Sequence, residues 1–140
     1  METTLTHLSN AFVADPELIL ELESRAKPIP LGPDRIFFHQ GDVATGVYLL
    51  RKGTVTLTSR SNDEAILSLK VGAGSLLGLP AVIATKPYTM TAQATQGAEL
   101  SLVTCHDFVE LMQTTPLLSF QVLKVLAEEV RFARQTLAHM

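Results

Sequence analysis

The chain has 140 residues, of which 46% are hydrophobic and 18% are charged, and its formal net charge is -3. This composition is typical of an ordered globular chain and argues against disorder. The 11 basic residues are scattered and are outnumbered by 14 acidic ones, whereas a nucleic-acid surface needs clustered Lys and Arg. We therefore expect a single domain over residues 1–140 that makes no direct contact with nucleic acid.

The cysteine content and the N-terminal sequence indicate the cellular compartment in which the protein is expected. Cys105 is the only cysteine, which excludes an intrachain disulfide and a multi-thiolate metal site. The N-terminus has no basic segment followed by an apolar run. No stretch approaches the roughly 18 apolar residues that a membrane span requires. We expect a cytoplasmic protein that neither crosses nor binds a membrane.

The first quarter of the chain is expected to be helical. Residues 3–26 read as two helical pieces, the second of which begins at Pro16 after Asp15, a suitable capping residue. Leu18 and Leu22 recur at helical spacing within it. The prolines and glycine of residues 27–35 then end any helix.

A β-rich region is expected from about residue 36 to 103. Its apolar runs are short, rich in Val, Leu, Thr, Tyr and Phe, and separated by turn residues. Gly41 and Gly53 occupy turns that favour positive φ, and Asp42 can close its own turn with a side-chain hydrogen bond. Many short strands at even spacing predict a sandwich or a barrel. The expected strands are 46–50, 54–59, 65–70, 88–94 and 99–103.

Residues 104–140 are expected to form two helices. Thr104 can cap a short helix over 106–113, with Asp107 at the capping-box position. Thr115 and Pro116 then open a longer helix that runs to the end of the chain.

The long helix carries two apolar stripes, which indicate two partners. One stripe, interrupted by Glu129, consists of Leu118, Val122, Val125 and Phe132. The other has the spacing of coiled-coil a and d positions and consists of Leu123, Leu126, Val130, Ala133 and Leu137. The first stripe can pack on the β-body while the second pairs with the same helix of another copy. A single wide core-facing surface is the alternative.

The segment IFFHQGDVATGVYLLRKGTVTL, residues 36–57, resembles the cyclic-nucleotide-binding domain of the Crp/Fnr regulators and of cyclic-nucleotide-dependent kinases. The resemblance extends from about Phe12 to Leu137. It implies a mainly β fold with flanking helices: a double-stranded β-helix, or jelly roll, with N-terminal helices and a long C-terminal helix. In the regulators that helix pairs in a dimer and precedes a helix-turn-helix domain. We expect this chain, which ends at Met140, to be the effector domain without the helix-turn-helix domain.

The resemblance also identifies a phosphate-binding cassette that has lost its charges. In the family the cassette reads Gly-Glu, a short helix, then Arg and a small or hydroxyl residue; Gly78 and Thr89 match its ends. Leu79 stands at the position of the Glu that binds the ribose hydroxyl, and Tyr88 at that of the Arg that pairs with the phosphate. Each lost charge-assisted hydrogen bond is worth about 1.5–3 kcal/mol. Pro80 also lacks an amide donor.

The expected ligand contacts are Gly78, Leu79, Pro80, Ala81, Tyr88, Thr89, Thr91 and Arg134. Arg134 is included because the end of the long helix reaches the ligand of the partner in the family. Lys86 either substitutes for the lost charge or is solvated. A cyclic nucleotide is disfavoured, and no other cofactor and no metal is expected.

Three functions stay open at this point. The first is a regulatory ligand-binding and dimerisation domain that takes a non-standard small-molecule effector or none. The second is a genuine cyclic AMP or cyclic GMP domain with substitute contacts. The third is a structural dimerisation module whose pocket is filled by its own side chains.

Catalysis finds little support in the sequence. There is no paired-carboxylate, nucleophile-elbow or triad pattern, and His39 stands alone in the β-region, without a second histidine for a metal site. Cys105 and His106 fall at a strand-to-helix junction, where cysteine is usually a small buried hydrophobe. We therefore do not expect an enzyme.

Overall fold

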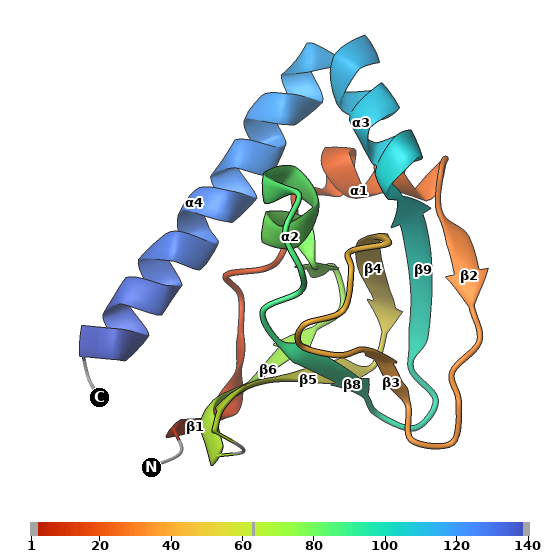
Figure 1. Ribbon diagram of the computed structural model, residues 1–140. Coiled ribbons are helices and arrows are strands. Elements are labelled where there is room, and N and C mark those ends of the chain that lie inside the picture. The colour runs from red at the N-terminus through yellow and green to blue at the C-terminus, as the bar shows by residue number, and fades with distance from the viewer. Residues whose placement is uncertain (1–2, 63, 139–140) are drawn as a thin grey trace.

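The computed structural model describes residues 3–62 and 64–138 and consists of two β-sheets with helices packed outside them (Figure 1). In chain order the elements are β1 (Thr3–Ser9), α1 (Pro16–Glu23), β2 (Lys27–Ile29), β3 (Ile36–Phe38), β4 (Gly46–Lys52), β5 (Thr54–Ser61), β6 (Glu64–Gly72), β7 (Leu76–Leu77), α2 (Leu79–Ala84), β8 (Thr91–Ala94), β9 (Glu99–Thr104), α3 (Cys105–Thr114) and α4 (Pro116–Ala138).

The two sheets face each other across an apolar interior. One has the strand order β1-β6-β5-β8-β3 and the other β2-β9-β4-β7. Val55 and Leu57 of the first sheet and Leu50, Leu77 and Leu100 of the second belong to one buried cluster, which we call the barrel core. This arrangement is the predicted mainly β jelly roll with flanking helices.

Strand β4 is buried on both faces because successive side chains of a strand point in opposite directions. Tyr48 and Leu50 enter the barrel core. Val47 and Leu49 enter a second cluster, the helical core, which they share with side chains of α1, α3 and α4. The strand is therefore a common wall between the two cores.

Residues 3–9 form strand β1, so the prediction of a helix there is wrong. β1 pairs in parallel with β6, from Thr3 opposite Leu67 to Ser9 opposite Val71. Its β-branched threonines suit a strand, and the pairing gives partners to backbone groups along the outer edge of β6. The partner strand lies some sixty residues away along the chain, as the register shows. No local sequence pattern therefore predicts this pairing.

Two predicted turn and cap interactions are confirmed, whereas the predicted side-chain cap by Asp15 is wrong. The Asp42 carboxylate accepts a hydrogen bond from the His39 backbone N–H at 3.0 Å and closes its own turn, in which Gly41 has φ +93°. The Thr104 hydroxyl accepts from the Asp107 N–H at 3.2 Å and caps α3. α1 begins at Pro16, although Asp15 makes no side-chain cap bond.

Helix α4 leaves the tip of α3 and descends along one side of the molecule (Figure 1). Its first predicted stripe faces inward: Leu118, Val122 and Val125 are at most 4% exposed in the helical core. Phe132 packs against the barrel core and meets the edge of Phe12 at 6.4 Å between ring centroids. None of the described helices is both long and apolar enough to span a bilayer.

Candidate functional site

The predicted cassette begins where Gly78 turns the chain from β7 into α2. Gly78 has φ +85°, in the left-handed region that favours glycine. A Cβ at this position would lie 2.6 Å from Cε1 of Tyr88. Glycine is therefore required both by the turn and by the close approach of the tyrosine ring.

Tyr88, which the family resemblance is expected to place at the arginine position of the cassette, is a core residue that is 2% exposed. Its ring stacks on Phe38 at 4.0 Å between centroids. Its hydroxyl accepts from the backbone N–H groups of Thr45 at 3.1 Å and Gly46 at 3.3 Å, and donates to the Gly46 carbonyl at 2.8 Å. The side chain thus fills space in the barrel core, and its polar atom is committed to the backbone at the start of β4.

The neighbouring tyrosine adds to this aromatic cluster. Tyr48 lies 5.5 Å from Phe38 between ring centroids, and its hydroxyl is 3.3 Å from the Thr45 hydroxyl. Burial raises the pKa of Tyr48 above its ordinary value of 10.0. The phenol therefore stays neutral at physiological pH.

Some of the other predicted contacts are already engaged within the fold, and the rest are exposed to solvent. Leu79 is fully buried in the helical core, and the Thr91 hydroxyl accepts from the Gln40 N–H at 3.0 Å. Pro80, Thr89 and Lys86 are exposed. The Lys86 ammonium forms no ion pair with any residue that the structure describes.

A small cavity of about 60 Å³ lies beside Tyr88. Sites for drug-sized ligands usually measure roughly 300–1,000 Å³, so in this conformation the cavity admits only a small chemical group. Of the predicted ligand contacts it brings together five and leaves out Leu79, Thr91 and Arg134. Its lining is Phe12, Phe38, Leu57, Leu77, Gly78, Pro80, Ala81, Tyr88, Thr89, Met90 and Glu129.

Glu129 of α4 is the acidic residue of the lining that sequence reasoning did not assign to the site. It is 9% exposed, and burial raises the pKa of its carboxyl from 4.5 to about 8. Within the described part of the chain its carboxyl has no hydrogen-bond or ion-pair partner. The signal was present in the sequence as a single acid that interrupts an apolar helical stripe.

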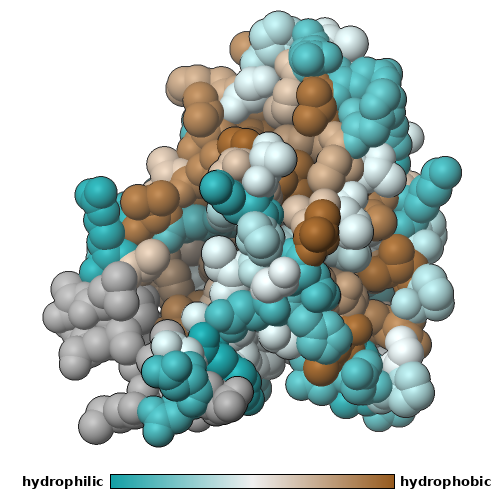
Figure 2. Space-filling view, in the orientation of Figure 1, coloured by the Kyte–Doolittle hydropathy of each residue, from teal (hydrophilic) through white to brown (hydrophobic). Residues whose placement is uncertain are grey.

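The outer face of α4 is apolar and exposed. Phe120, Leu123 and Val130 are 61%, 59% and 52% exposed, and Figure 2 shows hydrophobic residues among hydrophilic ones along this side of the molecule. Leu126 turns partly toward the helical core. Ala133 is exposed, and the side chain of Leu137 lies outside the described residues.

A shallow groove follows this face and contains Arg134. It is lined by Leu123, Leu126, Ala127, Val130, Arg131, Arg134 and Gln135. Arg134 therefore lies on the predicted dimer face and does not line the cavity beside Tyr88. Phe120 lies one turn before Leu123 on the same exposed face, but the a and d spacing did not include it in the predicted dimer stripe.

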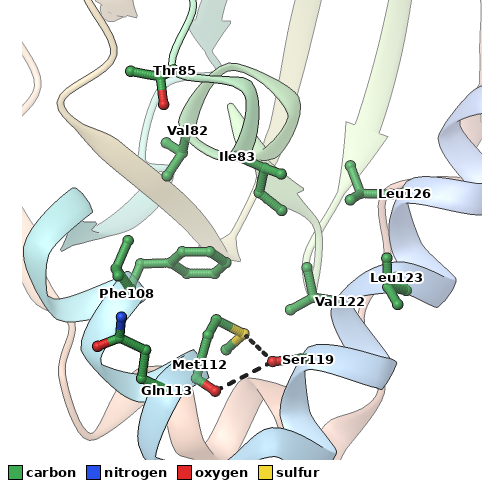
Figure 3. Close-up of a pocket in the computed structure, with 11 residues that line it drawn as sticks. Val82, Ile83, Thr85, Phe108, Met112, Gln113, Ser119, Val122, Leu123 and Leu126 are labelled. Atoms are coloured by element: carbon green, nitrogen blue, oxygen red, sulfur yellow. Dashed lines mark hydrogen bonds between the residues drawn. The ribbon is translucent and has the colours of Figure 1, made fainter.

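A second hollow of about 420 Å³ opens between α2, α3 and α4 (Figure 3). Ile83, Phe108, Met112 and Val122 form part of its apolar wall. The Ser119 hydroxyl, on the same wall, donates to the Met112 carbonyl at 3.3 Å. No local sequence pattern indicates this hollow, because its walls come from three separate elements.

The side chains of Cys105 and His106 contact different partners and do not form a common site. The half-buried Cys105 thiol is 3.4 Å from the Ala44 carbonyl. His106 is 83% exposed and lies 3.5 Å from Glu110, which also pairs with Arg25 at 3.1 Å. The cluster of His106, Asp107 and Glu110 is a surface feature of the first turns of α3.

Comparison with known proteins places these features in a family. Residues 28–115 match the cyclic nucleotide-binding domain, which is more than half of the chain. The chain belongs to the cyclic nucleotide-binding domain family. Tyr88 and Gly78 both lie within the matched region.

Two curated relatives illustrate the range of proteins that carry this domain. The chain is 30% identical to the cyclic AMP receptor protein of Thermus thermophilus over 98 residues, 69% of this chain and 45% of that protein. It is 26% identical to lysophospholipase nte1 of Neosartorya fischeri over 118 residues, 83% of this chain and 8% of that protein. The chain thus spans less than half the length of either relative.

The fold is also seen in solved structures. The catabolite activator protein of Thermus thermophilus superposes with a TM-score of 0.73 and 24% identity, over 93% of this chain and 62% of that one. This likeness confirms the predicted jelly roll with a long C-terminal helix.

Proposed function

We propose that this chain is a regulatory ligand-binding and dimerisation domain whose cassette no longer holds a cyclic phosphate. The observation that carries the proposal is the placement of Tyr88, whose side chain is buried and whose hydroxyl is hydrogen-bonded to the backbone of residues 45–46. A phosphate in the family's position would meet a phenyl ring instead of a guanidinium. Burial of an anion without such a partner is strongly unfavourable.

The dimerisation part of the proposal is supported by α4. Its inner face is packed in the helical core, whereas Phe120, Leu123 and Val130 expose large apolar side chains on the outer face. The same face of a second copy is the occupant that we propose, as the a and d spacing of the sequence predicts. Because Glu129 of α4 lines the cavity, a ligand there can bias the position of the helix that pairs.

A structural dimerisation module is the second candidate, and the small volume of the cavity, about 60 Å³, favours it. A genuine nucleotide domain would need Lys86, Thr89 and the partner's Arg134 as substitute contacts. We further propose that the role is regulatory and not catalytic, and that the chain acts in the cytoplasm, as its cysteine content predicts.

Calorimetric titration with cyclic AMP and cyclic GMP at low salt tests the proposal. We expect no heat of binding and no thermal stabilisation at millimolar nucleotide. Micromolar binding that weakens as salt is added would overturn it, because a phosphate contact is screened by salt. In that case the Lys86→Ala and Arg134→Ala variants would identify which substitute charge is used.

A further inference from the structure

The small cavity beside Tyr88 has an acidic character. Its walls come from β3, β5, β7, α2, residues 88–90, α4 and Phe12 after β1. Two ionisable side chains line it, Glu129 and Tyr88, and no Lys, Arg or His does so among the residues that the structure describes. The Tyr88 hydroxyl is already bonded to Gly46. Of these two ionisable groups, the Glu129 carboxyl is therefore the one that is free to bind a ligand.

A buried carboxyl without a partner is costly in its charged form. Burial alone accounts for the raised pKa of Glu129, about 8, so the group is mainly protonated at neutral pH. A ligand that carries a positive charge and donates hydrogen bonds would stabilise the ionised form through a charge-assisted hydrogen bond. The same ligand would gain from aromatic faces, because π-systems attract cations. Phe12, Phe38 and Tyr88 all line the cavity.

The size of the cavity limits the ligand further. A volume of about 60 Å³ corresponds to roughly two water molecules, at about 30 Å³ each in the liquid. This space accommodates an ammonium head with a methyl or methylene group. Pro80 and Thr89 line the cavity and are exposed, so a longer substituent can leave toward solvent beside them.

We propose that this cavity binds the ammonium group of a small primary amine, with the Glu129 carboxylate as hydrogen-bond acceptor and the aromatic rings as walls. This inference rests on the proposed ligand-binding role and names its ligand class, an organic cation in place of the anionic cyclic nucleotide.

Binding must be coupled to proton release. An alkylammonium group, with a pKa similar to the value of about 10.4 for lysine, stays charged up to pH 9. Glu129, with a pKa of about 8, must lose its proton to pair with it. The affinity therefore increases about tenfold from pH 7 to pH 9, in step with the ionised fraction of one such carboxyl.

Methylammonium chloride is the probe that tests the proposal. The Glu129 carboxyl is followed by NMR in the full chain labelled with carbon-13 glutamate, and its signal is assigned by its loss in Glu129→Gln. In tens of millimolar methylammonium we expect the pKa of Glu129 to fall by on the order of one unit. Equal sodium chloride, or methanol as a neutral molecule of the same size, should leave it unchanged. Millimolar affinity is expected for so small a ligand.

Thermal stabilisation by methylammonium provides a second measurement. It should disappear in Glu129→Gln, which mimics the protonated side chain and is expected to fold. It should persist in Glu128→Gln, the matched control, because Glu128 is an exposed neighbour that pairs with Arg131 at 3.7 Å. A pKa that does not move, or that moves equally in sodium chloride, overturns the inference.

The outcomes also separate this inference from the proposed function. If methylammonium has no effect on a chain that dimerises and ignores cyclic nucleotides, the cation site is wrong and the dimerising domain without a phosphate site stands. If cyclic AMP or cyclic GMP binds and shifts the Glu129 signal, the cavity accepts anions and both proposals fail.

Discussion

Tyr88 and Glu129 show how single residues set the chemistry of the pocket. A tyrosine at the arginine position of the cassette remains a prediction of the family resemblance, which needs only the residue type. The sequence did not predict that Tyr88 would be buried, because this depends on Gly78 and on the backbone of Thr45 and Gly46, which are distant along the chain. The sequence showed that Glu129 interrupts an apolar stripe of the long helix, but only the folded structure shows that it lines the cavity.

Glu129 makes the stability of the protein depend on pH. The pKa of Glu129 is about 8 in the folded chain and 4.5 as its ordinary value, so between these values the folded state holds the proton more tightly. The free energy of unfolding therefore falls as pH rises from 5 to 8, by up to about 1.4 kcal/mol per pH unit from this group. Glu129→Gln cannot ionise and should remove that decline.

Urea denaturation of both proteins at pH 5, 6.5 and 8 measures this effect. We expect the advantage of Glu129→Gln over the natural protein to grow by roughly 3 kcal/mol across the range. Glu128→Gln, at an exposed position on the same helix, should track the natural protein. Parallel curves for Glu129→Gln and the natural protein would contradict the raised pKa of this buried carboxyl.

At the scale of elements, local patterns predicted those structures whose causes are local. α3 follows from the cap at Thr104, and α1 from Pro16. β1 was missed because its partner strand, β6, lies far along the chain. The expected strand over 88–94 begins only at Thr91, because residues 88–90 bend to carry Tyr88 into the core.

Alanine substitutions at two glycines test why glycine is required in the turn into α2. Gly78 and Gly41 both have positive φ, +85° and +93°, so alanine at either position should cost about 1–2 kcal/mol of stability. At Gly41 nothing lies within 4 Å of an added Cβ, whereas at Gly78 the Tyr88 ring is 2.6 Å away. Gly78→Ala should therefore lose a further 1–3 kcal/mol or so from overpacking.

Chemical denaturation of the two variants makes the comparison. A similar loss in Gly78→Ala and Gly41→Ala would show that the ring of Tyr88 can move aside at little cost. In that event the contact between Gly78 and the ring of Tyr88 would not be what makes glycine necessary at this turn.

At the scale of the whole molecule, α4 packs one face into the helical core and exposes an apolar stripe on the other, which the proposed function assigns to a second copy. The inward stripe was predicted correctly. The outward stripe remains a prediction, which the structure refines by exposing Phe120 and turning Leu126 partly inward. A heptad pattern read along one helix does not reveal how that helix is rotated on the body beneath it, and the rotation decides which neighbours are exposed.

Self-association through α4 can be disrupted at one position. Leu123→Glu places a charge on the exposed apolar stripe and should weaken the dimer at least about tenfold, a difference of about 1.4 kcal/mol. Leu20→Glu on α1 is the control, since Leu20 is 66% exposed and Leu123 is 59% exposed. Sedimentation equilibrium measures the association. A natural chain that stays monomeric at high concentration, or equal weakening in both variants, would contradict an α4 interface.

The position of Tyr88 has a consequence for how this domain can respond to the cell. A diffusible ligand occupies a pocket in proportion to its concentration, but a side chain of the same chain is always present at a fixed effective concentration. The space that Tyr88 fills therefore reports nothing about the surroundings. Under the proposed function, a signal enters through the small cavity that remains, or through the abundance of the protein itself, which would set how many copies pair along α4.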